Sequence, residues 1–363
     1  LMKIGVLGSG QLGRMLALSA YPLGHQMRFL ALSEDEPSSL LGKTFVHNNN
    51  PEILNNFADS SDIVTYESEN TDVTIVNKIS QNTKVYPSHK SLYISQHRGR
   101  EKALLDKLKI PCAPYQMVNS LDDLKSAIKS IGIPSILKTA TDGYDGKGQF
   151  LIKSEIQLYE AWEKMSGVES ILEGFINFKR ELSLIAVRGI DGSLAYYPLV
   201  ENSHYEGILR LTIAPAQNIS EPLQKKAEGY MSSLLNEIKH VGVLTIELFE
   251  SDSGLLVNEI APRVHNSGHW TIEGAKTSQF ENHIRAITES PLGQTTSTKN
   301  FSAMINIIGV HGPIQKALKT KNAHLHLYDK EERTGRKLGH ITITSNSIDD
   351  LNQSIENLKE YLP

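Results

Sequence analysis

Thr141-Asp142-Gly143-Tyr144-Asp145-Gly146-Lys147-Gly148-Gln149 is the stretch of this sequence that most restricts the fold. It follows an apolar run that ends in Lys138, and a second apolar run begins at Phe150. The loop therefore joins two strands, whereas a P-loop would carry Gly-Lys-Ser/Thr at the start of a helix. Three glycines in a connection between two strands predict a mobile flap at residues 143–149.

Two lysines belong to this element. Lys147 lies at the tip of the flap, and Lys138 ends the strand before it. Two ammonium groups that face a polyphosphate offset the charge that develops during phosphoryl transfer. The pattern predicts a triphosphate site, and a solvated hairpin loop is the alternative.

A hairpin farther along the chain carries a pair of carboxylates. Glu247 and Glu259 are equidistant from Ser253 in a polar turn, so they face each other on one side of the sheet if the turn centres on that residue. Adjacent carboxylates repel, which favours a hard cation between them, and Mg²⁺ shared with phosphate oxygens fits. Asn258 would need a bulge to join the pair. The alternative is a solvent-facing pair bridged by lysines.

A polar segment follows this hairpin directly: Asn258-Glu259-Ile260-Ala261-Pro262-Arg263-Val264-His265-Asn266-Ser267-Gly268-His269-Trp270. Its composition and position predict a substrate-binding loop. His265 and His269 are four residues apart, but Gly268 disfavours a helix, so the spacing does not indicate a zinc site.

The N-terminal region alternates strand and helix patterns over residues 1–95, which predicts a parallel sheet with covering helices. Gly8-Ser9-Gly10-Gln11-Leu12-Gly13 lies between the first strand and the first helix, where glycines let backbone N–H groups approach an anion. Glu34 and Asp35 follow about twenty residues later, which suits a dinucleotide. A different phosphate or a structural tight turn explains the motif equally well.

The remaining chain divides into two further parts. Residues 96–293 carry the flap and the carboxylate hairpin, and a polar linker separates them from a small α+β region at 300–363. That region contains Tyr328-Asp329-Lys330-Glu331-Glu332-Arg333-Thr334-Gly335-Arg336-Lys337, with four basic residues in eight positions. A solvated turn is the default interpretation of such a run.

Composition narrows the class of protein. The chain has 363 residues, 39% of them hydrophobic, and a net charge of -4, which argues against broad binding to nucleic acid. The single cysteine, Cys112, leaves no intrachain disulfide framework and fits a reducing compartment. No apolar run reaches membrane length and the first residues form a strand pattern, so we expect a cytoplasmic protein that does not bind membranes.

Taken in order, these motifs resemble one family, the 5-(carboxyamino)imidazole ribonucleotide synthases, which are ATP-grasp carboxylases of purine biosynthesis. The resemblance is carried by residues 8–16, 143–149 and 258–270, and by Tyr328-Asp329-Lys330 with Gly335-Arg336-Lys337-Leu338-Gly339-His340. It implies an α/β and α+β protein of the ATP-grasp fold, with a Rossmann-like N-terminal domain, a central ATP-grasp domain and a small C-terminal domain. One departure is Ser68, at a position where the family often has a bulky residue.

The resemblance also implies residue roles. ATP would contact Arg98, Lys138, Gly143, Tyr144, Asp145, Gly146, Lys147, Gly148, Gln149, the adenine hinge Glu173-Gly174-Phe175-Ile176, Glu181, His204, Asn258 and Glu259. Mg²⁺ would be bound by Glu247 and Glu259. Aminoimidazole ribonucleotide would contact Tyr144, Asp145, Arg263, His265, Asn266, Ser267, Lys330 and Arg336. The residues expected to act in catalysis are Lys138, Lys147, Asp145 and Arg263.

The family's chemistry implies that bicarbonate attacks the γ-phosphate to give carboxyphosphate and ADP. The exocyclic amine of the ribonucleotide then captures carboxyphosphate, or CO₂ released from it. A homodimer is also implied. The rival predictions are another ATP-grasp enzyme, such as the formate-using glycinamide ribonucleotide transformylase or a biotin carboxylase, a nicotinamide-dependent dehydrogenase, and a non-catalytic nucleotide-binding scaffold.

Overall fold

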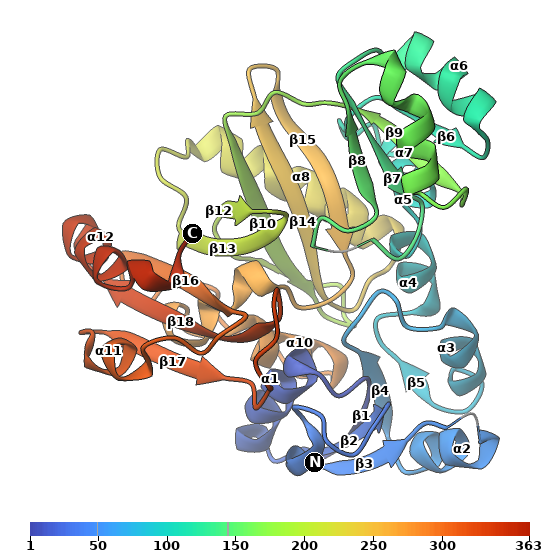
Figure 1. Cartoon of the computed structure of the whole chain (residues 1–363). Coiled ribbons are helices and arrows are strands. Elements are labelled where there is room, and N and C mark those ends of the chain that lie inside the picture. The colour runs from blue at the N-terminus through green and yellow to red at the C-terminus, as the bar shows by residue number, and fades with distance from the viewer. Residues whose placement is uncertain (49, 144) are drawn as a thin grey trace.

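The computed structural model describes residues 1–48, 50–143 and 145–363, which form three sheets with helices packed against them (Figure 1). The first sheet is entirely parallel and has the strand order β3-β2-β1-β4-β5. Its strands are β1 (Lys3–Leu7), β2 (Gln26–Ala31), β3 (Lys43–Val46), β4 (Ile63–Tyr66) and β5 (Lys84–Val85). Its helices are α1 (Gln11–Ala20), α2 (Pro51–Asp59) and α3 (Val73–Ile79), with short 3₁₀ turns at Tyr21–Leu23 and Ser39–Leu41. The parallel sheet predicted for the N-terminal region is confirmed.

Two helices, α4 (His89–Ser95) and α5 (Arg98–Lys107), lead from this sheet to a four-stranded antiparallel one. The second sheet has the order β6-β9-β7-β8, with β6 (Tyr115–Val118), β7 (Ser135–Thr139), β8 (Gln149–Ile152) and β9 (Ser170–Gly174). Its helices are α6 (Leu121–Ile131) and α7 (Leu158–Lys164), the latter after a 3₁₀ turn at Glu155–Gln157. The flap connects β7 to β8, so the prediction that it joins two strands is confirmed.

The third sheet is antiparallel and holds nine strands, eight of them in the order β15-β14-β10-β12-β13-β16-β18-β17, with β11 paired to β10. The strands from the central region are β10 (Arg180–Arg188), β11 (Leu194–Tyr196), β12 (Val200–Tyr205), β13 (Ile208–Ala214), β14 (Gly242–Ser251) and β15 (Gly254–Ala261). Those from the C-terminal region are β16 (Phe301–Ile308), β17 (Ala323–Leu327) and β18 (Lys337–Ser345).

The pairing of β13 with β16 makes this sheet continuous between the two regions. Five helices and two 3₁₀ turns complete this part of the chain: α8 (Glu221–Glu237), α9 (Thr271–Gly274), α10 (Gln279–Ile287), α11 (Ile314–Lys319), α12 (Ile348–Asn357), Asn266–Gly268 and Lys359–Tyr361. The domain limits at residues 95, 293 and 300 stay a prediction.

One hydrophobic core joins the N-terminal sheet to the large sheet. Met15 and Leu16 of α1 lie in the same buried cluster as Phe280 and Ile284 of α10 and Val243 of β14. Burial of such side chains contributes about 1.5–3 kcal/mol each. The N-terminal sheet is therefore packed firmly beside the carboxylate hairpin. Within the described residues, no helix is long and apolar enough to cross a lipid bilayer.

Candidate active site

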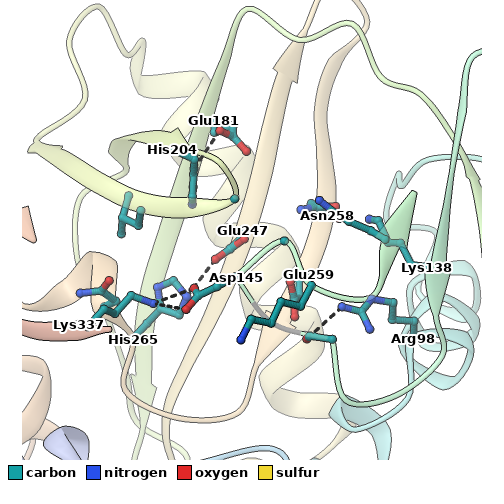
Figure 2. Close-up of a pocket in the computed structure, with 17 residues that line it drawn as sticks. Arg98, Lys138, Asp145, Glu181, His204, Glu247, Asn258, Glu259, His265 and Lys337 are labelled. Carbon is teal, nitrogen blue, oxygen red and sulfur yellow. Dashed lines mark hydrogen bonds and ion pairs between the residues drawn. The ribbon is translucent and has the colours of Figure 1, made fainter. Parts of the chain in front are cut away.

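Two cavities meet where the flap, the β14–β15 hairpin and the C-terminal region come together. Figure 2 shows side chains from these elements pointing into the first cavity. Fourteen predicted residues line it: Arg98, Lys138, Gly143, Asp145, Gly146, Lys147, Gln149, Glu181, His204, Glu247, Asn258, Glu259, His265 and Asn266. Three that were not predicted complete the lining: Gly207, Leu209 and Lys337. Tyr144 lies outside the described residues.

The predicted carboxylate pair is present, but its geometric origin differs from the prediction. Glu247 on β14 and Glu259 on β15 are register partners. The turn pairs Ser251 with Gly254, so it centres between Asp252 and Ser253, and an uninterrupted ladder would not place the two glutamates opposite each other. A β-bulge at Asn258 shifts the register by one residue and restores the match. The expectation that the turn centres on Ser253 was wrong.

The two carboxylates differ electrostatically. Burial and the facing Glu247 carboxylate raise the pKa of Glu259. Burial acts in the same direction on Glu247, but the His265 ring, whose Nε2 lies 3.0 Å from Glu247 Oε1, lowers the pKa of that carboxyl overall. His265 is itself fixed from the other side, where its Nδ1 lies 2.7 Å from Ser267 Oγ. The two carboxylates thus repel each other, and a cation bound between them would relieve that repulsion.

These two residues suit a magnesium ion that is only partly bound by protein. Among residues 1–48, 50–143 and 145–363, no group of three or more His, Cys, Asp or Glu side chains is arranged to hold a metal ion. Mg²⁺ commonly takes one or two carboxylates and fills its other positions with water and substrate phosphate oxygens. Glu247 and Glu259, which open into the same cavity as Lys138 and Arg98, fit that pattern.

Two sets of side-chain contacts help to hold the described part of the flap. Arg98, at the start of α5, donates to Thr139 O at 2.9 Å and to Gly143 O at 3.3 Å, which fixes the entry to the flap. Farther along, Lys337 Nζ donates to both carboxylate oxygens of Asp145, at 2.8 and 3.0 Å. The second contact joins the flap to the first residue of β18. An ion pair thus links two walls of the cavity, the flap and β18, that are distant in sequence (Figure 2).

Lys138 is placed by a buried carboxylate. Its Nζ lies 2.8 Å from Glu173 Oε2, and Glu173, which is 4% exposed, also pairs with the buried Lys102 at 3.6 Å. The predicted adenine hinge, Glu173-Gly174-Phe175-Ile176, ends β9 and continues beyond it, and none of its residues lines either cavity. In this structure Glu173 is therefore the ion-pair partner of Lys138.

Glu181 and His204 form a second ion pair at the opposite wall, with His204 Nδ1 2.9 Å from Glu181 Oε2. Burial lowers the pKa of His204, but the hydrogen bond to Glu181 and the negative charges of Glu181 and Glu247 together outweigh it, and the net shift of the pKa is upward. The side chains come from neighbouring strands, β10 and β12. Glu181 is the register partner of Asn202, so His204, two residues farther along β12, lies on the same face of the sheet.

The second cavity opens between all three regions of the chain. Seven of its lining residues are shared with the first cavity: Gly143, Asp145, Glu247, Glu259, His265, Asn266 and Lys337. The others are Gln11, Leu12, Glu67, Ser68, Glu69, Ala261, Arg263, His269 and Tyr328. Arg263 forms a two-pronged ion pair with Glu69, with Nη2 donating to Oε1 at 2.9 Å and Nε donating to Oε2. A carboxylate from the N-terminal region thus aligns the predicted guanidinium.

The glycine-rich turn binds a side chain of its own chain. Gly10 N donates to Glu67 Oε1 at 2.7 Å, and Gly13 N donates to Oε2 at 2.6 Å. A Cβ built on Gly8, whose φ is +113°, would lie 2.4 Å from Glu67 Oε1, so that position has no room for a side chain. The helix N-terminus that a dinucleotide phosphate would use is occupied by a carboxylate, which favours the structural interpretation of the motif.

The remaining predicted substrate residues are more distant from the cavities. Lys330 Nζ donates to Gln11 Oε1 at 2.6 Å, and burial together with the nearby Arg336 lowers the pKa of Lys330 to about 8. Arg336 donates to Glu331 O at 3.2 Å and lines neither cavity. Ser267 is fully buried, where it accepts a hydrogen bond from Ser183 Oγ at 2.7 Å, so the structure gives it a supporting position behind His265.

Sequence reasoning missed several residues of the site. Lys337 follows Arg336 in the basic run, and no local pattern indicates which of the two lines the cavity. Glu69 and Gln11 reach the second cavity only because the N-terminal sheet packs beside the hairpin. The one available signal was the segment Tyr66-Glu67-Ser68-Glu69-Asn70, in which two carboxylates follow a buried strand.

The chain matches three family models: the ribonucleotide synthetase pre-ATP-grasp domain over residues 1–96, the ATP-grasp domain over 103–280, and the phosphoribosylaminoimidazole carboxylase C-terminal domain over 302–354. It is 46% identical over 343 residues to the N5-carboxyaminoimidazole ribonucleotide synthase of Pseudomonas aeruginosa, and 94% of each chain is covered.

Solved structures agree with this match. The N5-carboxyaminoimidazole ribonucleotide synthetase of Thermus thermophilus is 46% identical, with a TM-score of 0.94 over 99% of this chain and 98% of that one. The Aspergillus clavatus synthase, solved in complex with ADP and 5-aminoimidazole ribonucleotide, is 32% identical, with a TM-score of 0.92 over 99% and 98% of the two chains. As its sequence motifs predicted, the chain belongs to the family of N5-carboxyaminoimidazole ribonucleotide synthases.

Proposed function

We propose that this chain uses ATP and bicarbonate to carboxylate the exocyclic amine of 5-aminoimidazole ribonucleotide, giving 5-(carboxyamino)imidazole ribonucleotide, ADP and phosphate. The observation that carries the proposal is the meeting of two cavities at one carboxylate pair. A site that couples ATP cleavage to carboxylation needs both substrates within reach of a single reacting centre. Glu247, Glu259 and Asp145 line both cavities.

The first cavity would take ATP. Lys138 and Arg98 stand on one side of the carboxylate pair and Lys147 belongs to the flap, so these three cations line the cavity together with Lys337. Glu247 and Glu259 would hold Mg²⁺, which neutralises phosphate charge during transfer. Lys138 and Lys147 would stabilise the same charge from the protein side. Attack of a bicarbonate oxygen on the γ-phosphorus would then give carboxyphosphate and ADP.

The second cavity would take the ribonucleotide. Arg263 is oriented by Glu69, and His265 and Asn266 stand between the two cavities. Lys330 and Arg336, on the loop before β18, would bind the 5′-phosphate, since a dianion needs cations and Arg can bind two of its oxygens. The flap, fastened by Lys337, would keep water from carboxyphosphate until the amine captures its carboxyl group or the CO₂ that it releases.

The proposal extends to the setting of the enzyme. Family resemblance supports a homodimer. The cytoplasm is supported by the presence of one cysteine in 363 residues, which is typical of a protein without structural disulfides.

The decisive experiment measures ADP release with each small molecule omitted in turn. Full turnover should require ATP, Mg²⁺, bicarbonate and 5-aminoimidazole ribonucleotide, and the carboxylated product should form in step with ADP. The assignment is wrong if formate and glycinamide ribonucleotide support turnover in place of bicarbonate and the aminoimidazole, or if absorbance follows nicotinamide reduction without ADP release.

A further inference from the structure

Helix α5 presents one unusual face to the carboxylate hairpin. One side of the helix carries Arg98 and the residues three, four and seven positions after it, which are Glu101, Lys102 and Leu105. Glu101 is 2% exposed and Lys102 is 1% exposed. Charged side chains are rarely buried so completely without a specific partner, because their desolvation is costly. Both residues lie outside the two cavities and were not among the predicted site residues.

Their partners are backbone groups on either side of Glu259. Ile260 N donates to Glu101 Oε1 at 3.1 Å, and Lys102 Nζ donates to Asn258 O at 3.2 Å. Two consecutive residues of the helix therefore grip the residues immediately before and after one carboxylate of the pair.

The sheet topology explains why such a grip is needed. β15 is an edge strand of the nine-stranded sheet, so its outward-facing N–H and C=O groups have no neighbouring strand to pair with. The bulge at Asn258 also interrupts the ladder at the point where Glu259 must face Glu247. A bulged edge strand tends to twist and bend unless other groups hold it.

Helix α5 is also linked to Lys138. Lys102 shares the buried Glu173 with Lys138, at 3.6 and 2.8 Å respectively. Lys102 therefore contacts the bulge on one side and the partner of Lys138 on the other. Figure 2 shows Lys138 and Arg98, the first residue of α5, on the same side of Glu259.

We propose that Glu101 and Lys102 are positioning residues that clamp the bulge of β15, so that Glu259 faces Glu247 in the geometry a divalent cation needs, and that Lys102 also sets the position of Lys138 through Glu173. This inference rests on the proposed role of the carboxylate pair in holding Mg²⁺. The residues act through the backbone and through Glu173 and do not themselves contact substrate.

The test compares Glu101→Ala, Glu101→Gln and Lys102→Met with Lys107→Met, a control that removes an exposed ion pair with Glu237 from the same helix. The side-chain oxygen of Gln still accepts a hydrogen bond, so Glu101→Gln keeps an acceptor for Ile260 N, whereas Glu101→Ala removes it. Two readouts are independent of turnover: hydrogen exchange at the Ile260 amide, and the affinity for Mn²⁺ measured by electron paramagnetic resonance in the presence of ADP.

We expect Glu101→Ala to speed exchange at Ile260 and to weaken Mn²⁺ binding, each about ten-fold, which corresponds to loss of one buried hydrogen bond. Lys102→Met should weaken Mn²⁺ binding similarly and should also weaken ADP binding measured without metal. Glu101→Gln and Lys107→Met should stay within about two-fold of the wild-type chain, and all four melting temperatures are measured to confirm folding.

The clamp is refuted if Glu101→Ala leaves both readouts unchanged, or if Glu101→Gln weakens Mn²⁺ as much as Glu101→Ala does. Should Glu101→Ala fail to fold, Glu101→Gln decides alone, since a ten-fold loss of Mn²⁺ affinity in that variant contradicts a role based on accepting the Ile260 hydrogen bond. Failure of the proposed function looks different: the wild-type chain would then bind no Mn²⁺ at the site, whereas exchange at Ile260 would still report on the clamp.

Discussion

The ion pair between Lys337 and Asp145 allows the strength of flap closure to be predicted from the structure. The ammonium donates two hydrogen bonds, at 2.8 and 3.0 Å, and the side chains are 19% and 29% exposed. A hydrogen bond to a charged group contributes about 1.5–3 kcal/mol, and partial exposure reduces the net value to about 1–2 kcal/mol. Lys337→Met should therefore raise the open fraction of the flap about five- to thirty-fold.

Trypsin cleavage after Lys147, an exposed residue of the flap, measures this opening directly. When opening and closing are fast relative to cleavage, the cleavage rate follows the open population. Affinity for an ATP analogue should fall much less, because it follows the closed fraction, which changes little while most of the flap stays closed. Lys316→Met, which removes an exposed ion pair with Glu360 from the same C-terminal region, is the matched control and should change neither quantity.

A double-mutant cycle separates this pair from any general loosening of the C-terminal region. In an Asp145→Asn background, Lys337→Met should have little further effect on cleavage, since its charged partner is already gone. An undiminished effect in that background, or equal cleavage of the wild-type chain and Lys337→Met, would show that other contacts hold the flap.

Three further outcomes are expected. Glu259→Gln should lower kcat/KM about 10²–10³-fold at limiting Mg²⁺, by analogy with the loss of one stabilising group at a developing charge, and wild-type kinetics would remove that residue from the metal site. Arg336→Ala should weaken binding of the ribonucleotide about ten- to hundred-fold while leaving ATP affinity intact, so separate titrations with the two ligands decide whether Arg336 and Lys330 serve the phosphate. His283 is buried and its Nδ1 accepts a hydrogen bond from Val243 N at 3.1 Å, and burial lowers its pKa to about 3. Because the unfolded chain protonates this histidine below about pH 6.5 and the folded chain does not, its contribution is fully present above that pH and is lost as the pH falls toward 3. Between pH 7 and pH 5 the wild-type chain should therefore lose about 2 kcal/mol more stability than His283→Gln. Urea unfolding of both chains at each pH measures this difference, and an equal loss of unfolding free energy in the two chains would contradict it.

The sequence allowed the local elements of the site to be predicted because their signals are local. The glycines of the flap and the strand patterns around them define a two-strand connection, and the alternation before residue 95 predicts a parallel sheet. The spacing of Glu247 and Glu259 led to a correct pairing from an incorrect turn centre. The error arose because a two-residue turn and a bulge shift the register in opposite directions, and neither shift is visible in the spacing alone.

The rest of the site could not be predicted because it depends on packing between distant segments. Lys102 grips Asn258 across 156 positions, and Lys337 reaches Asp145 across 192. In the sequence Glu67 is simply a glutamate after a strand, and only the fold shows that it accepts hydrogen bonds from Gly10 and Gly13. In each case the side chain is defined by a partner on another element, and a single sequence contains no local pattern that reveals such a partner.

The continuous sheet has a consequence for how the chain can be divided. β13 pairs with β16, so the C-terminal strands complete the hydrogen bonding of the strand that follows His204. A fragment ending near residue 299 would leave β13 with one row of unsatisfied backbone groups, and such a row readily recruits strands from other molecules. The C-terminal region therefore covers the exposed edge of the central part of the sheet, besides carrying the residues proposed to bind the 5′-phosphate. Its removal should cause the remaining fragment to self-associate through the exposed edge of β13, even before any substrate is added.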